Sequence, residues 1–364
     1  VMNILLPAVQ TDFGMSFTAL GLLAASYDWG NAVLLILGGY LSDRYGKARL
    51  ILIGLAWFVV VNAATGLAPS AWSLIGLRFA AGFAFGTYFT AGNSLLAEAF
   101  APAKRGRAIG LHYAGGSVGR FVIPILAGAI TTSIGWRPAL LPLSVAATAA
   151  AVLFIFLKWP TETPVRGAGP SGEALWKMLK NQEIIKISAV YFLIVFANTE
   201  VIFIPVYLVR TWSLTITEAA FYMGIAALVS IPAALILGEL SDRLGWKKVV
   251  MATLAADGLL LVLFPFAAPG LGLAAVLLGL GIANRCITVG IAMATRASEP
   301  AHRAMSLGLI NTVGIAALTV LSVLGGYIAD IAGLSTVFFF ISAVAIVGCI
   351  ALWVTRLELL ALKW

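Results

Sequence analysis

Long runs of apolar residues fill most of the chain and predict its secondary structure. A helix that crosses a membrane needs about 20 apolar residues, and eleven runs of this kind follow one another along the sequence. The opening VMNILLPAVQ is apolar too but only about half a span long, so we interpret it as the end of a twelfth helix whose first half is missing. The eleven runs cover approximately residues 16–41, 50–68, 72–98, 107–131, 137–157, 185–209, 218–240, 249–268, 270–294, 304–329 and 334–355.

The composition excludes a water-soluble protein. Hydrophobic residues make up 61% of the chain and charged residues only 10%, whereas soluble domains carry about a quarter charged residues. We therefore predict an all-α polytopic membrane protein. Cys286 and Cys349 both lie inside apolar runs, so we interpret them as packing residues and not as a disulfide.

The sequence contains a repeat of about half its length. The segment GYLSDRYGKAR, from Gly39 to Arg49, recurs as GELSDRLGWKK, from Gly238 to Lys248, and each copy lies between two apolar runs. Such a repeat predicts two parallel six-helix bundles. We expect an N-terminal bundle at 1–157, a cytoplasmic linker at 158–184 and a C-terminal bundle at 185–364. Identical residues also recur at an offset of 198 residues, as Pro7/Pro205, Pro102/Pro300, Arg105/Arg303, Gly110/Gly308 and Gly128/Gly326.

The positive charges predict the orientation in the membrane. Of the 23 Lys and Arg residues, 18 lie in alternate connections, and only Arg137 and Arg210 lie in the connections on the other side. Lys and Arg accumulate on the cytoplasmic side, so we expect both termini in the cytoplasm of a bacterial or archaeal cell, with the lipid bilayer as a partner. This placement accounts for the net charge of +8 without nucleic acid. Within the linker, GEALWKMLKN fits either a short helix on the inner membrane surface or a loosely ordered segment.

The doubled segment resembles the loop motif of the major facilitator superfamily, roughly GxLxDRxGRR, and the resemblance covers the whole chain apart from the missing start. The alternative is that its charges only fix the orientation. The resemblance implies two cytoplasmic hinges that gate the protein, and Glu98 with Arg105 resembles the charge cluster that, with Asp43, latches the outward-facing state. The hinge residues are Gly39, Asp43, Arg44, Gly46, Lys47 and Arg49 in the first copy and Gly238, Asp242, Arg243, Gly245, Lys247 and Lys248 in the second.

Two further segments bear on the resemblance. Arg78 followed by Gly82 and Gly86 is similar to the fourth-helix motif of the superfamily, in which the arginine is associated with proton coupling. We expect the two glycines to serve close helix packing. The segment GRFVIPILAG departs from the fifth-helix glycine signature of the drug exporters, because Ile123 replaces one of its glycines and Arg120 follows the first. This departure weakens an exporter assignment.

Four charged residues lie near the middle of their apolar runs. Each costs about 2.5–3.5 kcal/mol in a bilayer unless it is paired or faces water. They either form permanent ion pairs between helices, or they form a substrate and coupling site in which arginines bind an anion and a desolvated carboxylate exchanges a proton. Asp257, in another run, is interpreted as a packing partner at the bundle periphery. The four residues are Asp28, Arg120, Glu200 and Arg285, to which Arg78 is added by the resemblance.

The sequence has no HExxH, GxSxG, CxxC or Walker motif, so it predicts no enzyme, no cofactor and no metal site. We predict a monomeric secondary transporter that works by alternating access and moves a small organic anion with protons. One alternative is a proton-coupled multidrug efflux antiporter, for which aromatic residues would line the cavity. Another is a non-transporting membrane receptor on the same scaffold. The candidate aromatic residues are Tyr27, Trp29, Tyr88, Phe89, Tyr113 and Tyr191.

Overall fold

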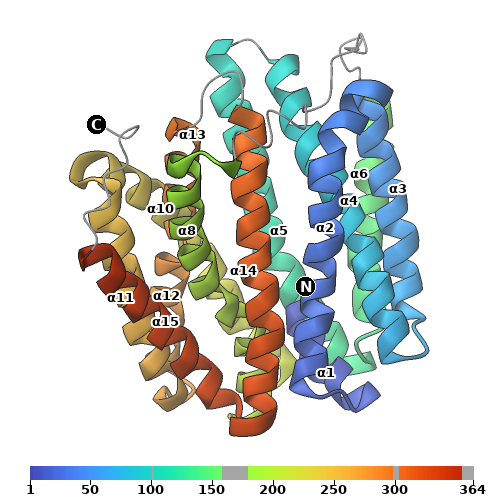
Figure 1. Ribbon diagram of the computed structural model, residues 1–364. Coiled ribbons are helices and arrows are strands. Elements are labelled where there is room, and N and C mark those ends of the chain that lie inside the picture. The colour runs from blue at the N-terminus through green and yellow to red at the C-terminus, as the bar shows by residue number, and fades with distance from the viewer. Residues whose placement is uncertain (101, 158–178, 298–302, 355–364) are drawn as a thin grey trace. The chain divides into compact units, whose positions relative to one another are not determined.

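The computed structural model describes residues 1–100, 102–157, 179–297 and 303–354, and these ranges are helical, with no strand (Figure 1). Each of the eleven apolar runs coincides with a helical segment. Eight helices in the described ranges are long and apolar enough to cross a membrane. The predicted all-α polytopic membrane fold is therefore confirmed.

The chain folds into two compact units. Unit 1 comprises Val1–Met15, Leu22–Gly169 and Thr215–Thr217, and unit 2 comprises Ser16–Gly21, Pro170–Leu214 and Glu218–Trp364. The expected surface helix in the linker falls at 172–181, mostly outside the residues that the structure describes.

Unit 1 is a bundle in which α3 contacts α4 and α6, while α5 contacts α1, α4 and α6. The short apolar opening of the chain is helical, as expected. The helices of this unit are α1 (Met2–Phe13), α2 (Phe17–Tyr45, of which the first five residues belong to unit 2), α3 (Lys47–Gly66), α4 (Ala71–Ala99), α5 (Pro102–Ile134), η1 (Pro138–Leu140) and α6 (Leu141–Phe156).

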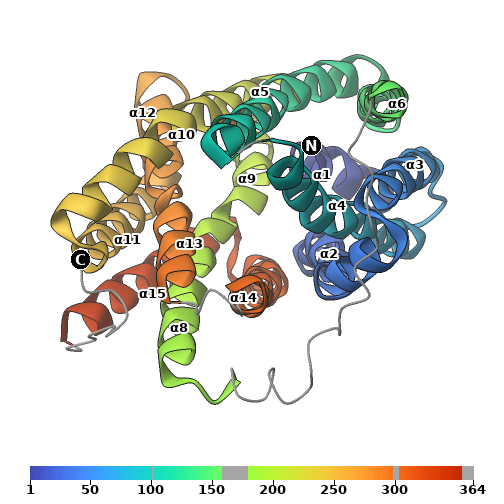
Figure 2. The ribbon, with the colours of Figure 1, turned by 90° about the horizontal axis from the view of Figure 1, so that it is seen from above.

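Unit 2 repeats the helical plan and includes two interrupted spans. Figure 2 shows α8 beside α13, α14 and α15, and all three contact it. Its helices are α8 (Gln182–Ala197), η2 (Asn198–Ile202), α9 (Ile204–Arg210), α10 (Ile216–Leu244), α11 (Trp246–Leu263), η3 (Phe264–Phe266), α12 (Leu271–Ala283), α13 (Cys286–Ala297), α14 (Arg303–Ala332) and α15 (Leu334–Val354).

Local capping signals explain where several helices begin and end. Helix α1 ends at Gly14, which adopts the left-handed conformation with φ 62° that glycine tolerates best. Helix α4 begins with a capping box, in which the side chains of Ser70 and Ser73 bond each other's backbone N–H groups. Helix α8 begins at Gln182, three residues before the expected bundle start at 185, because the Asn181 side chain accepts from the N–H groups of Glu183 and Ile184.

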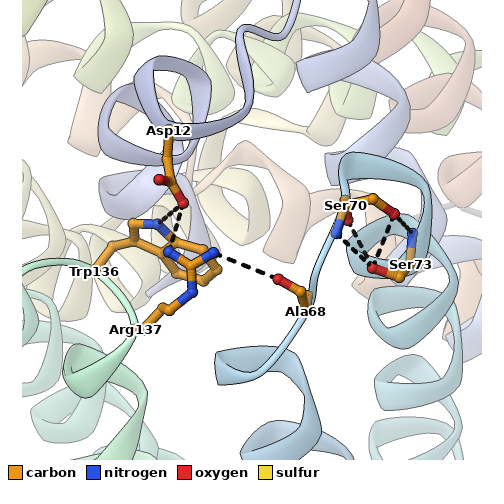
Figure 3. Close-up of polar contacts among 6 residues, drawn as sticks. All are labelled: Asp12, Ala68, Ser70, Ser73, Trp136 and Arg137. Atoms are coloured by element: carbon orange, nitrogen blue, oxygen red, sulfur yellow. Dashed lines mark hydrogen bonds and ion pairs between the residues drawn. The ribbon is translucent and has the colours of Figure 1, made fainter.

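One polar cluster links the last turn of α1 to the connections that follow α3 and α5 in unit 1 (Figure 3). The Asp12 carboxylate accepts from Arg137 Nη1 at 2.6 Å and from Trp136 Nε1 at 3.0 Å. Arg137 Nη2 also donates to the carbonyl of Ala68 at 3.4 Å, and its guanidinium lies 4.6 Å from the Trp136 ring centroid. The cluster therefore fixes the ends of α1, α3 and α5 relative to one another within unit 1.

Glycines let α2 and α4 approach at the level of their backbones. A Cβ atom built on Gly82 would overlap the carbonyl oxygen of Tyr27, and one built on Gly30 would overlap that of Phe79. A Cβ on Gly86 would crowd Asn31 in the same way. The structure therefore supports the expectation that Gly82 and Gly86 serve close helix packing.

This packing gives a testable contrast within α4. Gly82→Ala should destabilise the protein by about 1–3 kcal/mol, because the added methyl group must push the α2 backbone away. Gly76→Ala on the same helix is the matched control: a Cβ there meets nothing within 4 Å, so the higher helix propensity of alanine should leave stability unchanged or raise it by up to about 1 kcal/mol. Unfolding temperatures in detergent measure both, and equal effects would contradict the close approach.

Candidate functional site

The first span of unit 2 is interrupted at Glu200. Helix α8 ends at Ala197, a 3₁₀ segment carries Asn198 to Ile202, and α9 starts at Ile204. Pro205 lies in the first turn of α9. Because proline lacks an N–H and clashes with the carbonyl four residues earlier, it prevents α8 from continuing as a regular helix. The break places Glu200 where the backbone leaves its α-helical path.

A second break lies between α12 and α13. It consists of Asn284 and Arg285. Backbone hydrogen bonds here span three residues instead of four: Arg285 N donates to the Ile282 carbonyl and Thr288 N to the Arg285 carbonyl, both at 3.0 Å. The Thr288 hydroxyl donates to that same Arg285 carbonyl at 2.7 Å. Two spans of unit 2 are thus discontinuous, which in transporters is a typical feature of substrate and ion sites.

A hydrogen bond joins the two breaks. The Asn284 side-chain amide donates to Glu200 Oε1 at 2.7 Å. Glu200 is completely buried, and so is its neighbour Thr199. A buried carboxylate is costly without partners, so this bond fixes both the carboxylate and the relative position of the two interrupted spans. Arg285 lies half-buried next to Asn284 in the same turn.

The remaining charged residues predicted for the site, Asp28, Arg78 and Arg120, belong to unit 1. In unit 1, the Arg78 guanidinium lies 4.6 Å from the Tyr27 ring centroid and within electrostatic range of the Asp28 carboxylate. Arg78 and Asp28 are both half-buried, whereas Arg120 is exposed. The structure therefore groups Asp28 with Arg78 and Glu200 with Asn284 beside Arg285. A place for Arg120 in either group stays a prediction.

The two hinges share one backbone geometry. Gly46 at the start of α3 has φ 91° and ψ 136°, and Gly245 at the start of α11 has φ 88° and ψ 142°. Each N–H donates to the carbonyl four residues earlier, on Ser42 and Ser241. Positive φ is costly for any other residue, which explains why both copies of the motif have glycine at this place. In the second hinge, Arg243 forms an ion pair with Glu239.

The structure describes the side chains of only some of the hinge residues. The side chains of Asp43, Glu98 and Arg105 lie outside the part of the structure that is described, and so does the environment of Gly39. Their gating role stays a prediction. Among those described, Arg44, Arg49, Lys248, Asp242 and Arg243 are exposed, as expected for residues at a membrane surface, and Lys47 and Lys247 are half-buried.

Sequence reasoning overlooked two residues of this site. Asn284 interrupts an apolar run directly before Arg285, and a polar residue at that place could have indicated a site residue. Asp257 was interpreted as a peripheral packing residue, but it is buried, 3% exposed, close enough to Glu200 for their charges to interact. Helix α11 contacts both α8 and α13, which brings Asp257 to the two breaks.

Two helical units of membrane-spanning segments, with a shared hinge geometry and interrupted spans, define a polytopic membrane protein built from an internal repeat. The family model described as Major Facilitator Superfamily matches residues 1–288 and 202–360. The chain belongs to this superfamily. The crystal structure of the nucleoside transporter NupG has the same fold, with a TM-score of 0.79 at 15% identity, covering 96% of this chain and 94% of that one.

Curated relatives match a part of the chain. The multidrug resistance protein Stp of Mycobacterium tuberculosis is 36% identical over 138 residues, which are 38% of this chain and 26% of that protein. The cis,cis-muconate transport protein of Acinetobacter baylyi is 29% identical over 185 residues, covering 50% and 43% respectively. The aligned regions thus span less than half the length of these relatives.

Proposed function

We propose that the protein is a secondary active transporter that works by alternating access and moves a small organic anion together with protons. The observation that carries this proposal is the buried Glu200 carboxylate, held by Asn284 where two interrupted spans meet, with Arg285 following Asn284 in the chain. Coupling of this kind needs a cationic side chain that binds the anion and a carboxylate that exchanges a proton, and Arg285 and Glu200 carry these groups at the two helix breaks.

Glu200 suits the coupling role because of its surroundings. It is completely buried, so its negative charge is costly and its neutral form is accessible by taking up a proton. The Asn284 amide bond keeps the carboxylate in place in either state, because an amide N–H can donate to a carboxylate or to a carboxylic acid. A carboxylate that changes charge without moving can bias the conformation of the spans around it.

Arg285 supports the choice of an anion. A guanidinium offers a planar, permanently charged fork that binds carboxylate or sulfonate groups through two parallel hydrogen bonds. The names of two relatives fit this chemistry: the cis,cis-muconate transport protein and the probable sulfoacetate transporter of Cupriavidus necator, which is 29% identical over 151 residues. Both named solutes are organic acids.

A second candidate is proton-coupled export of amphipathic drugs. The multidrug resistance protein Stp favours it, as does the puromycin resistance protein of Streptomyces alboniger, which is 32% identical over 138 residues. Within unit 2, an apolar groove of about 470 Å³ between α10, α11 and α12 could take an apolar molecule. Its buried and half-buried lining includes Leu237, Val249 and Leu260. The charged site at Glu200 favours the anion over this alternative.

The two hinges are proposed to gate the cytoplasmic side. Their glycines fix a tight turn between successive spans, so the connection resists stretching and transmits movement from one helix to the next. Asp43 and Asp242 supply a charge at each turn that can interact with a neighbouring helix end. With the positive charges on the same side, we place the two hinges on the cytoplasmic face and the protein, as a monomer, in a bacterial or archaeal membrane.

If Glu200 couples the solute to protons, its substitution should stop proton-driven uptake and leave solute exchange intact. Glu200→Gln keeps the acceptor for Asn284 but cannot exchange a proton, so it should abolish uphill uptake of labelled cis,cis-muconate into proteoliposomes with an imposed pH gradient. Exchange between preloaded vesicles should persist. Glu218→Gln, at an exposed acid in the first turn of α10 outside the hinge, is the control and should keep both. Full pH-driven uptake by Glu200→Gln would remove this carboxylate from the mechanism.

The anion proposal predicts a loss of affinity without loss of fold. Arg285→Lys keeps the charge but loses the planar fork, so muconate or sulfoacetate binding should weaken by about 1–3 kcal/mol, the range of a charge-assisted hydrogen bond. Arg210→Lys, at the exposed end of α9, is the matched control and should bind normally. If wild-type protein binds neither anion but binds a cationic or neutral drug, the export function replaces this one.

A further inference from the structure

The surroundings of Glu200 are rich in buried acceptors. Glu200 Oε2, both carboxylate oxygens of Asp257 and the Asn284 side-chain oxygen are buried, and none accepts a hydrogen bond from the residues that the structure describes. Glu200 Oε1 alone is satisfied, by the Asn284 amide at 2.7 Å. Buried polar atoms in folded proteins nearly always have partners, so four buried acceptors in this region favour an occupant that supplies a hydrogen or a positive charge.

The neighbouring hydroxyl and thiol groups do not supply that group. The Thr253 hydroxyl, one turn before Asp257 on α11, gives its hydrogen to the carbonyls of Val249 and Val250, both at 2.9 Å. The Cys286 thiol hydrogen-bonds Thr253, and Cys286 lies close enough to Asp257 to sense its charge. Thr253 therefore has no free hydrogen to donate to the carboxylates.

Electrostatics favours an occupant that carries one positive charge. Glu200 and Asp257 are 0% and 3% exposed and lie within electrostatic range of each other. Two carboxylates that close together in a low-dielectric interior cannot both stay ionised without a cation between them. A shared proton converts the pair into an acid and a carboxylate joined by a strong hydrogen bond, and a small metal cation would be bound by the same oxygens.

We propose that Glu200 and Asp257, together with the Asn284 side-chain oxygen, form a buried site in unit 2 for one small cation, a proton or a sodium ion. The inference deepens the proposed function and relies on it only for the link between this site and transport. Asp257 thereby becomes the second carboxylate of the coupling site. The site spans three separate elements, the α8 break, the α12–α13 break and α11, so its occupancy can alter how they pack.

Few other titratable groups face the pair. On the elements in contact with α11, the other titratable side chains include the Cys286 thiol on α13, the Glu183–Lys186 ion pair in the first turns of α8, and Tyr191 on α8, whose hydroxyl donates to Asn311 Oδ1 at 3.1 Å. Helix α15 also contacts α11, and its one titratable side chain in the described range, Cys349, donates to a carbonyl of α11 at 3.4 Å. Any effect of pH on this region should therefore depend on the two carboxylates.

The test measures cation binding without any solute or flux. Unfolding temperatures of the purified protein in detergent are recorded over a pH series in potassium chloride, and again with sodium chloride at the same ionic strength. A cation that binds only the folded state stabilises it. We expect the wild-type unfolding temperature to rise as the pH is lowered if the occupant is a proton, or to rise in sodium over potassium if it is sodium.

Variants assign the effect to the pair. Asp257→Asn and Glu200→Gln each remove one negative charge and should lose most of the cation-dependent rise, while Asp257→Glu should keep it. Glu239→Gln, an exposed acid on α10, is the matched control and should behave as wild type. If Asp257→Asn does not give folded protein, the comparison of Glu200→Gln with Asp257→Glu carries the same readout.

Two results would overturn the site: a wild-type unfolding temperature insensitive to both cations, or a rise that persists unchanged when either carboxylate is neutralised. Because no transported solute is involved, these results are independent of the muconate flux. A cation effect without coupled flux would contradict the proposed transport function and support the site. Coupled flux without the cation effect would contradict the site and support the transport function.

Discussion

The hydrogen bond from Asn284 to Glu200 holds the interior of unit 2 together at its least regular point. It joins the interruptions of two membrane spans, where the backbone is not α-helical and regular helix hydrogen bonds alone cannot hold it. It also fixes a completely buried carboxylate, the proposed coupling group, to the turn that carries Arg285, the proposed anion-binding residue.

Much of the fold could be predicted from the sequence, because the membrane simplifies the problem. Spans must be helical and about 20 residues long, so the apolar runs located the helical segments in the ranges that the structure describes. The doubled hinge indicated the repeat, and Gly46 and Gly245 then showed the same backbone conformation. Helix starts were less predictable: α8 begins ahead of the expected boundary because Asn181 caps it, which depends on a local side-chain bond.

The site was only partly predictable, because depth along a span can be counted but direction around it cannot. Counting placed Asp28, Arg120, Glu200 and Arg285 at one level. The structure buries Glu200 completely and exposes Arg120, and it places Arg78 near Asp28. Asp257 was dismissed because its helix was expected at the periphery, yet α11 contacts both α8 and α13. Contacts of this kind arise from packing and leave no pattern in one sequence.

A double-mutant cycle on Glu200 and Asn284 tests the central claim most directly. The free energy of unfolding is measured for Glu200→Ala, Asn284→Ala and the double variant, with Glu239 and Asn284 as a distant control pair. A buried hydrogen bond to a carboxylate predicts a coupling energy of about 1.5–3 kcal/mol for the first pair, and none for the control. Effects of Glu200→Ala and Asn284→Ala that simply add, within about 0.3–0.5 kcal/mol, would show that the two breaks are not joined.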